Sequence, residues 1–256
     1  MARPMTSPSW KYKICFAYDG TQYCGWQIQS NALTIQEVLE KKLSVILRRK
    51  TTVTGASRTD SGVHAQGQVA HFEHPEEIEC FRFLASINGV LPRDIRVKTI
   101  EAVDKDFHAR FHAANKIYHY HLNLGYIQDP FTRRYSWHIP QKLDLDLLKK
   151  GAALFVGTHD FTSFSNEALA GAAAKNPVRT LRRLEMVFED NGVRLEYEAK
   201  GFLYKMVRNI TGTLIEAAMG QRAVHEIPEI FSAKDRRKGG RTAPPQGLFL
   251  VKVEYA

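Results

Sequence analysis

The stretch LRRLEMVFEDNGVRLEYEA, residues 181–199, decides the fold class because it is the clearest β-hairpin pattern in the chain. Two runs with regularly placed apolar residues, 181–188 and 193–199, flank the pair Asn191-Gly192. This pair is typical of the tight turns that join antiparallel strands. The stretch therefore predicts a pair of antiparallel strands in the C-terminal half of the chain.

Strands and helices are also predicted on both sides of this hairpin. The patterns indicate strands at 10–18, 69–72, 95–103, 116–124 and 248–253. They indicate helices at 34–47, 81–88, 143–155 and 202–219. Thr34 and Glu37 have the spacing of a capping box at the start of the first helix. Residues 165–178 are Ala-rich without apolar periodicity, which predicts a mobile loop.

The order of these elements repeats loosely, so we expect an α+β chain with two similar halves. The N-terminal subdomain is predicted to span residues 1–105 and the C-terminal subdomain residues 106–256. Short connections favour a mainly antiparallel sheet with helices on one face. A doubly wound parallel sheet would need regular strand–helix alternation and a glycine-rich first turn, and neither pattern occurs.

Composition narrows the class of protein. The 256 residues carry 36 Lys and Arg against 27 Asp and Glu, a formal charge of +9, which favours a polyanionic partner such as nucleic acid. A basic protein whose surface binds nothing is the alternative. Three scattered cysteines predict a reduced, cytoplasmic protein rather than a disulfide framework. No apolar run is long enough to span a membrane, and the first eight residues do not resemble a signal peptide.

The segment 56–65, Ala-Ser-Arg-Thr-Asp-Ser-Gly-Val-His-Ala, is the strongest candidate for chemistry. It is polar, contains glycine, and lies between a predicted helix and a predicted strand, where catalytic side chains often occur. It places Arg58 two residues from Asp60. A neighbouring arginine favours the ionised carboxylate, which can act as a nucleophile or a general base. The alternative is a turn-capping Asp60 in an ordinary surface ion pair with Arg58.

Two basic groups are candidates for binding phosphate. Lys205 and Arg208 lie one turn apart at the start of a predicted helix, and helix N-termini and arginine side chains attract phosphate. A second group is a basic cluster near the C-terminus: Lys234, Arg236, Arg237, Lys238 and Arg241. Runs of this kind are usually only solvated, but with the net charge they favour a phosphate-binding groove.

Five ordered stretches resemble the tRNA pseudouridine synthases of the TruA family. Residues 58–65, RTDSGVHA, resemble the family signature RTDAGVHA. Residues 19–27, DGTQYCGWQ, resemble its opening motif, and residues 116–120, KIYHY, resemble its K-Y-Y strand. Residues 202–210, FLYKMVRNI, and 243–248, APPQGL, resemble its two C-terminal blocks. The likeness covers roughly residues 12–255.

This resemblance implies both a fold and an activity. The fold would be two similar α/β subdomains with a continuous, mainly antiparallel sheet, flanking helices and an RNA-binding cleft between them. The activity would be isomerisation of uridine to pseudouridine in the anticodon stem-loop of tRNA, around positions 38–40. The family also implies a homodimer, a tRNA that touches both subunits, and no cofactor or metal.

The resemblance also assigns roles to individual residues. Asp60 matches the nucleophile. Arg58 matches the arginine that opens and holds the RNA around the target base, and Tyr118 matches the tyrosine that contacts that base and the catalytic aspartate. Arg208 matches the arginine that pairs with the aspartate. Lys205 stands in a variable pair of the family pattern, so its candidacy for local RNA contacts rests on its charge at the start of the predicted helix.

Two departures from the family pattern concern the signature loop. Ser57 stands where glycine is usual, and Ser61 where alanine is usual. If position 57 needs a positive φ, Ser57 would be strained there.

Two other functions remain open from the sequence. One is a non-catalytic RNA-binding protein. The other is a metal-dependent nuclease that uses Asp60 with His64 or His71, although the histidines lack a recognised metal spacing and no HExxH, P-loop or GxGxxG motif occurs.

Overall fold

The computed structural model describes residues 10–166 and 176–256, which form two compact units. The N-terminal unit comprises the described residues up to Ala114 together with Leu250–Ala256, and the C-terminal unit comprises the described part of Asn115–Phe249. Most of the loop predicted at 165–178 lies outside the described residues.

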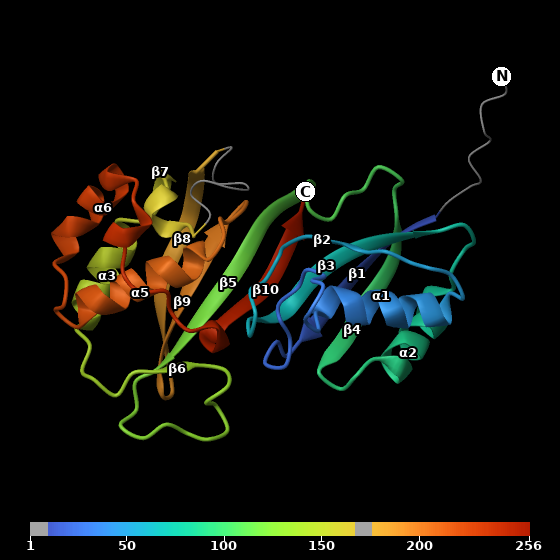
Figure 1. Cartoon of the computed structure of the whole chain (residues 1–256), viewed down its shortest axis with the longest axis horizontal. Coiled ribbons are helices and arrows are strands. Elements are labelled where there is room, and N and C mark those ends of the chain that lie inside the picture. Colours follow the sequence, from blue (N-terminus) through green and yellow to red (C-terminus); the bar gives the residue numbers. More distant parts are fainter. Residues whose placement is uncertain (1–9, 167–175) are drawn as a thin grey trace. The chain divides into compact units, whose positions relative to one another are not determined.

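The N-terminal unit is built on the strands β1 (Trp10–Tyr18), β3 (His64–His74), β4 (Ile95–Val103) and β10 (Leu248–Tyr255). Their order is β4-β1-β3-β10, and the short β2 (Thr54–Gly55) pairs with β3 (Figure 1). β1 runs antiparallel to both β3 and β4, and β2 runs antiparallel to β3. The antiparallel arrangement predicted for this half is confirmed.

Alternation along β1 places one face of this sheet in the core. Tyr12, Ile14, Phe16 and Tyr18 are each at most 4 % exposed, whereas the residues between them are half-buried. The helices α1 (Ile35–Ile46) and α2 (Cys80–Val90) belong to this unit and are drawn over its strands in Figure 1.

The predicted start of the first helix is also confirmed. The Thr34 side chain accepts a hydrogen bond from the backbone N–H of Glu37 and caps α1. The strand predicted at 69–72 is longer than expected, because β3 begins at His64.

The C-terminal unit is built on the strands β5 (Ala113–Asn123), β7 (Gly157–Asp160), β8 (Val178–Glu189) and β9 (Gly192–Ala199). Their order is β5-β9-β8-β7, each adjacent pair is antiparallel, and β6 (Trp137–His138) adds a short parallel bridge to β5. The predicted hairpin is β8–β9. Its turn lies one residue earlier than expected, since Glu189 pairs with Gly192.

The described part of this unit contains the helices α3 (Leu145–Ala153), α5 (Met206–Ala218) and α6 (Ile227–Ala233). α5 is buried along almost its whole length, and its Thr211 and Thr213 hydroxyls donate to carbonyls one turn earlier in the helix. The helix predicted over 202–219 begins only at Met206, because Lys205 adopts a left-handed conformation with φ +58°. Among the described residues, no helix has the length and apolarity needed to cross a membrane.

Candidate active site

The loop that carries Arg58 and Asp60 connects β2 to β3. Asp60 opens a tight turn in which the Val63 N–H donates to the Asp60 carbonyl at 3.1 Å. Gly62 has φ +75°, as the third position of a type II turn requires. Asp60 is half-buried and Arg58 is exposed. The predicted catalytic loop is therefore a short turn with defined backbone bonds.

A second segment, 19–26, packs against this turn backbone to backbone. The Trp26 N–H donates to the Thr59 carbonyl at 3.0 Å, and the Gly62 N–H donates to the Tyr23 carbonyl at 3.2 Å. Gly25 has φ +81°, and a Cβ there would lie 2.5 Å from the Thr59 carbonyl oxygen. The close approach of the two segments explains why glycine stands at this position.

A buried polar layer lies beneath the loop, and the sequence patterns did not single it out. The Tyr18 hydroxyl is 2.8 Å from the Thr59 hydroxyl, and the Gln68 side chain donates to the Ser57 carbonyl at 2.8 Å. Burial raises the pKa of Tyr18 to about 12, so its hydroxyl stays protonated near neutral pH. The one sequence feature that could have indicated this layer is Gln68, a polar residue next to the apolar run of the predicted strand.

The strain expected at Ser57 does not arise. Among the described residues, the non-glycine positions with positive φ are Arg48, Lys205 and Lys234. The serine that replaces the usual alanine, Ser61, is exposed and donates to the Tyr23 carbonyl at 3.3 Å. Both substitutions are compatible with the observed turn.

The two histidines of the nuclease hypothesis take part in scaffold contacts. His64 is 1 % exposed, and its Nδ1 lies 3.1 Å from both the Gly20 amide nitrogen and Asp19 Oδ1. His71 Nδ1 accepts a hydrogen bond from the Ala109 N–H at 3.1 Å, and burial, followed by the nearby His108, lowers the pKa of His71 to about 4. In the described part of the chain, no three or more His, Cys, Asp or Glu side chains are grouped to hold a metal ion.

The other candidate residues lie in the C-terminal unit. Tyr118 is on β5, is 5 % exposed, and meets the Phe202 ring edge-on with 5.0 Å between centroids. Arg208 lies in the first turn of α5, and its Nε donates to the Ala243 carbonyl at 2.8 Å. The Ala243 N–H donates back to the Arg208 carbonyl at 3.0 Å. The structure thus brings the stretches 202–210 and 243–248 together.

The stretch 116–120 joins the same group, because the Tyr120 hydroxyl donates to the Pro244 carbonyl at 2.7 Å. Lys205, at the start of α5, holds its Nζ 5.0 Å from the centre of the Tyr204 ring. Three of the five resembling stretches therefore meet within the C-terminal unit, and the other two, 19–27 and 58–65, meet within the N-terminal unit.

The basic cluster at 234–241 is mostly engaged in contacts within its own unit. Lys234 pairs with Asp160, Arg237 pairs with Asp235, and the Arg241 guanidinium lies 4.7 Å from the Trp137 ring centre. Arg236 donates to the side chains of Asn209 and Thr242. These contacts hold four of the five side chains against their own unit, while Lys234 and Arg237 remain exposed.

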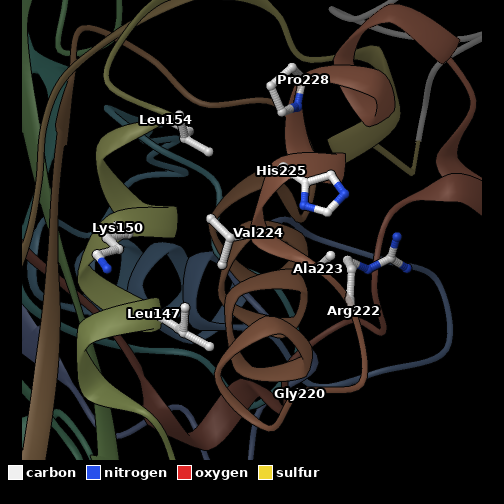
Figure 2. A pocket seen from close by; sticks show the side chains of 9 residues that line it. All are labelled: Leu147, Lys150, Leu154, Gly220, Arg222, Ala223, Val224, His225 and Pro228. Carbon is white, nitrogen blue, oxygen red and sulfur yellow. The ribbon is translucent and has the colours of Figure 1, made fainter.

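A separate hollow lies in the C-terminal unit between α3 and the segment 220–228 (Figure 2). Its walls are largely apolar, from Leu147 and Leu154 on one side to Val224 and Pro228 on the other. Its one arginine, Arg222, pairs with Glu216 and Glu226. None of the predicted site residues lines this hollow.

Comparison with known proteins identifies the family. A family model described as tRNA pseudouridine synthase matches residues 14–112 and 152–256. The tRNA pseudouridine synthase A 1 of Protochlamydia amoebophila is 55% identical over 245 residues, which cover 95% of this chain and 96% of that protein. The tRNA pseudouridine synthases A of Ruminiclostridium cellulolyticum and Acetivibrio thermocellus are 44% and 42% identical, and the matches cover 96% and 95% of this chain and 99% and 98% of theirs. The chain therefore belongs to the tRNA pseudouridine synthase family of isomerases.

Proposed function

We propose that the protein converts uridine to pseudouridine in the anticodon stem-loop of tRNA, around positions 38–40, with Asp60 as the nucleophile. The observation that carries the proposal is the construction of the loop: a half-buried carboxylate at a turn whose backbone is bonded to the segment 19–26 and to a buried polar layer. Such rigidity suits a group that must meet a reacting atom in one geometry.

The chemistry accounts for an aspartate without a cofactor. The N1–C1′ glycosidic bond of uridine breaks, a C5–C1′ bond forms, and the proton of C5 leaves while N1 gains one. The rearrangement is redox-neutral. The Asp60 carboxylate can attack the base or the sugar, or assist deprotonation at the sugar, and these routes share the same requirement for a placed carboxylate.

The target base must leave its stack before this reaction, which costs a few kcal/mol. We propose that Arg58, which is exposed, holds the opened RNA, and that Tyr118 contacts the flipped base. Arg208 is proposed to pair with the catalytic carboxylate and Lys205 to contact the RNA. We further propose a cytoplasmic homodimer that acts on tRNA without a metal ion or cofactor.

The replacement Asp60→Ala tests this proposal. Pseudouridine formation releases the C5 hydrogen, so tritium release from tRNA that contains 5-tritiated uridine measures turnover. We expect Asp60→Ala to abolish release while tRNA binding persists. Asp146→Ala, an exposed carboxylate in the first turn of α3, is the matched control and should release tritium at the wild-type rate. Undiminished release by Asp60→Ala would refute the assignment.

Chelation separates the proposal from its rivals. Tritium release should be unchanged in EDTA, whereas a metal-dependent nuclease would lose its activity. A protein that binds tRNA but releases no tritium in any buffer would be the non-catalytic RNA-binding protein.

A further inference from the structure

The loop before Asp60 leaves the sheet in an unusual way. β2 pairs with β3 through Thr54 and Gly55, and the ladder continues where the Ala56 N–H donates to the Val69 carbonyl at 2.7 Å. At the next residue, Ser57, the side chain of Gln68 provides the bonds. Its Nε2 donates to the Ser57 carbonyl at 2.8 Å, and its Oε1 accepts from the Ser57 N–H at 3.3 Å.

The Gln68 amide thus bonds to both backbone groups of Ser57, the residue that follows the backbone bond of Ala56. A primary amide offers the same donor and acceptor as a peptide group, so it can hold Ser57 from a greater distance than the β3 backbone can. Gln68 is 0 % exposed. The chain can therefore leave β3 to form the loop while the backbone of Ser57 remains fixed.

Tyr18 holds the loop on the other side of Arg58. Its hydroxyl lies 2.8 Å from the Thr59 hydroxyl, and both residues are buried, at 4 % and 8 % exposure. The Thr59 carbonyl is in turn held by the Trp26 N–H. The residue directly before Asp60 is therefore fixed through its side chain and through its carbonyl.

We infer that Tyr18, Gln68 and Thr59 are positioning residues that set the direction of the Asp60 carboxylate, an inference that rests on the proposed function. Phenylalanine in place of Tyr18, methionine in place of Gln68 and valine in place of Thr59 would each fill a similar volume without burying a polar group. Buried polar groups cost free energy unless they are paired, so packing alone does not explain why these three residues are polar. Their bonds converge on Ser57 and Thr59, which flank Arg58 and precede Asp60.

The test compares two tyrosines on one strand. Tyr18→Phe removes only the hydroxyl that holds Thr59. Tyr12→Phe, the control on the same strand, removes the hydroxyl of a similarly buried tyrosine six residues earlier, which accepts from the Ile78 N–H at 2.7 Å. Both should lose similar stability in urea unfolding. Only Tyr18→Phe should lower kcat for tritium release, by about tenfold or more, because a displacement of about 1 Å can cost about 10²-fold. The KM for tRNA should change by less than about twofold, since the buried hydroxyl does not touch RNA.

Thr59→Val removes the other half of the same bond. It should reproduce the fall in kcat. The double variant Tyr18→Phe/Thr59→Val should be no slower than Tyr18→Phe, because Tyr18→Phe already removes both the bond to Thr59 and the 3.5 Å contact from Gln68 Nε2. Wild-type kcat in Tyr18→Phe, an equal fall in Tyr12→Phe, or multiplied losses in the double variant would overturn the inference. Asp60→Ala in the same assay keeps the two proposals separate. If Asp60→Ala still releases tritium, the proposed function fails. If Asp60→Ala is inactive and Tyr18→Phe has wild-type kcat, only the positioning role fails.

Discussion

The replacement Gly25→Ala probes how the segment 19–26 holds the proposed catalytic loop around Asp60. Gly25 has φ +81°, a conformation that alanine adopts with difficulty. A Cβ at this position would lie 2.5 Å from the Thr59 carbonyl oxygen and 3.0 Å from the Asp60 carbonyl carbon. Both obstacles are backbone atoms of the loop, so the clash cannot be relieved by rotating a side chain.

Two contributions set the expected loss in the free energy of unfolding of Gly25→Ala. The left-handed conformation costs an L-residue about 1–2 kcal/mol. Inserting a methyl group into a closely packed region costs about 1–3 kcal/mol more. The 2.5 Å approach is about 0.9 Å shorter than ordinary contact, so the loop must move by a comparable distance. A displacement of that size predicts a loss of about 10²-fold in kcat.

Urea unfolding and tritium release measure the two consequences separately. Gly89→Ala is the matched control, because no atom lies within 4 Å of its added Cβ and the residue is in α2. Alanine should stabilise that helix by about 0.5–1 kcal/mol and leave kcat unchanged. A folded Gly25→Ala protein with wild-type kcat would refute the reasoning that the segment 19–26 sets the position of Asp60.

Three further predictions concern titration, charge and binding. Burial lowers the pKa of His71 from 6.5 in the unfolded chain to about 4 in the folded protein. Between these two pH values the unfolded chain binds the proton more readily, so the free energy of unfolding is fully retained above pH 6.5 and falls as the pH drops towards 4. In urea unfolding, the wild type should lose about 2 kcal/mol more free energy of unfolding between pH 7 and pH 5 than His71→Gln does. An equal loss in the two proteins would contradict this. Arg208→Ala should impair turnover more than binding, whereas a large loss of tRNA affinity with normal kcat would make Arg208 a phosphate contact. Affinity for tRNA should fall steeply as salt rises, and a flat response in filter binding would remove the argument from net charge.

Local patterns predicted the elements whose signals lie within a few residues. The hairpin β8–β9 and the Thr34 cap of α1 both follow from neighbouring residues. β6, β7 and α6 were missed because segments this short carry too little periodicity to be distinguished from loops. β3 was predicted too short because its buried polar residues, His64 and Gln68, interrupt the apolar run.

The sequence singles out the loop that carries Arg58 and Asp60 as the candidate site, but not the residues that support it. Arg58 and Asp60 belong to one compact motif. The bonds that hold them join residues 41 and 11 positions apart, Tyr18 to Thr59 and Ser57 to Gln68. A tyrosine at the end of a strand and a glutamine inside one are ordinary until the fold brings them beneath the same loop. The left-handed conformation of Lys205 at the start of α5 was likewise not predicted.

Locating pseudouridine in tRNA treated with the purified protein tests the central claim most directly. An unmodified tRNA transcript is incubated with wild-type protein or with Asp60→Asn, which keeps the shape of the side chain and removes its charge. Pseudouridine is then mapped by chemical derivatisation and primer extension. We predict modification within positions 38–40 by the wild type and none by Asp60→Asn. Equal modification by Asp60→Asn, or none by the wild type, would contradict the account.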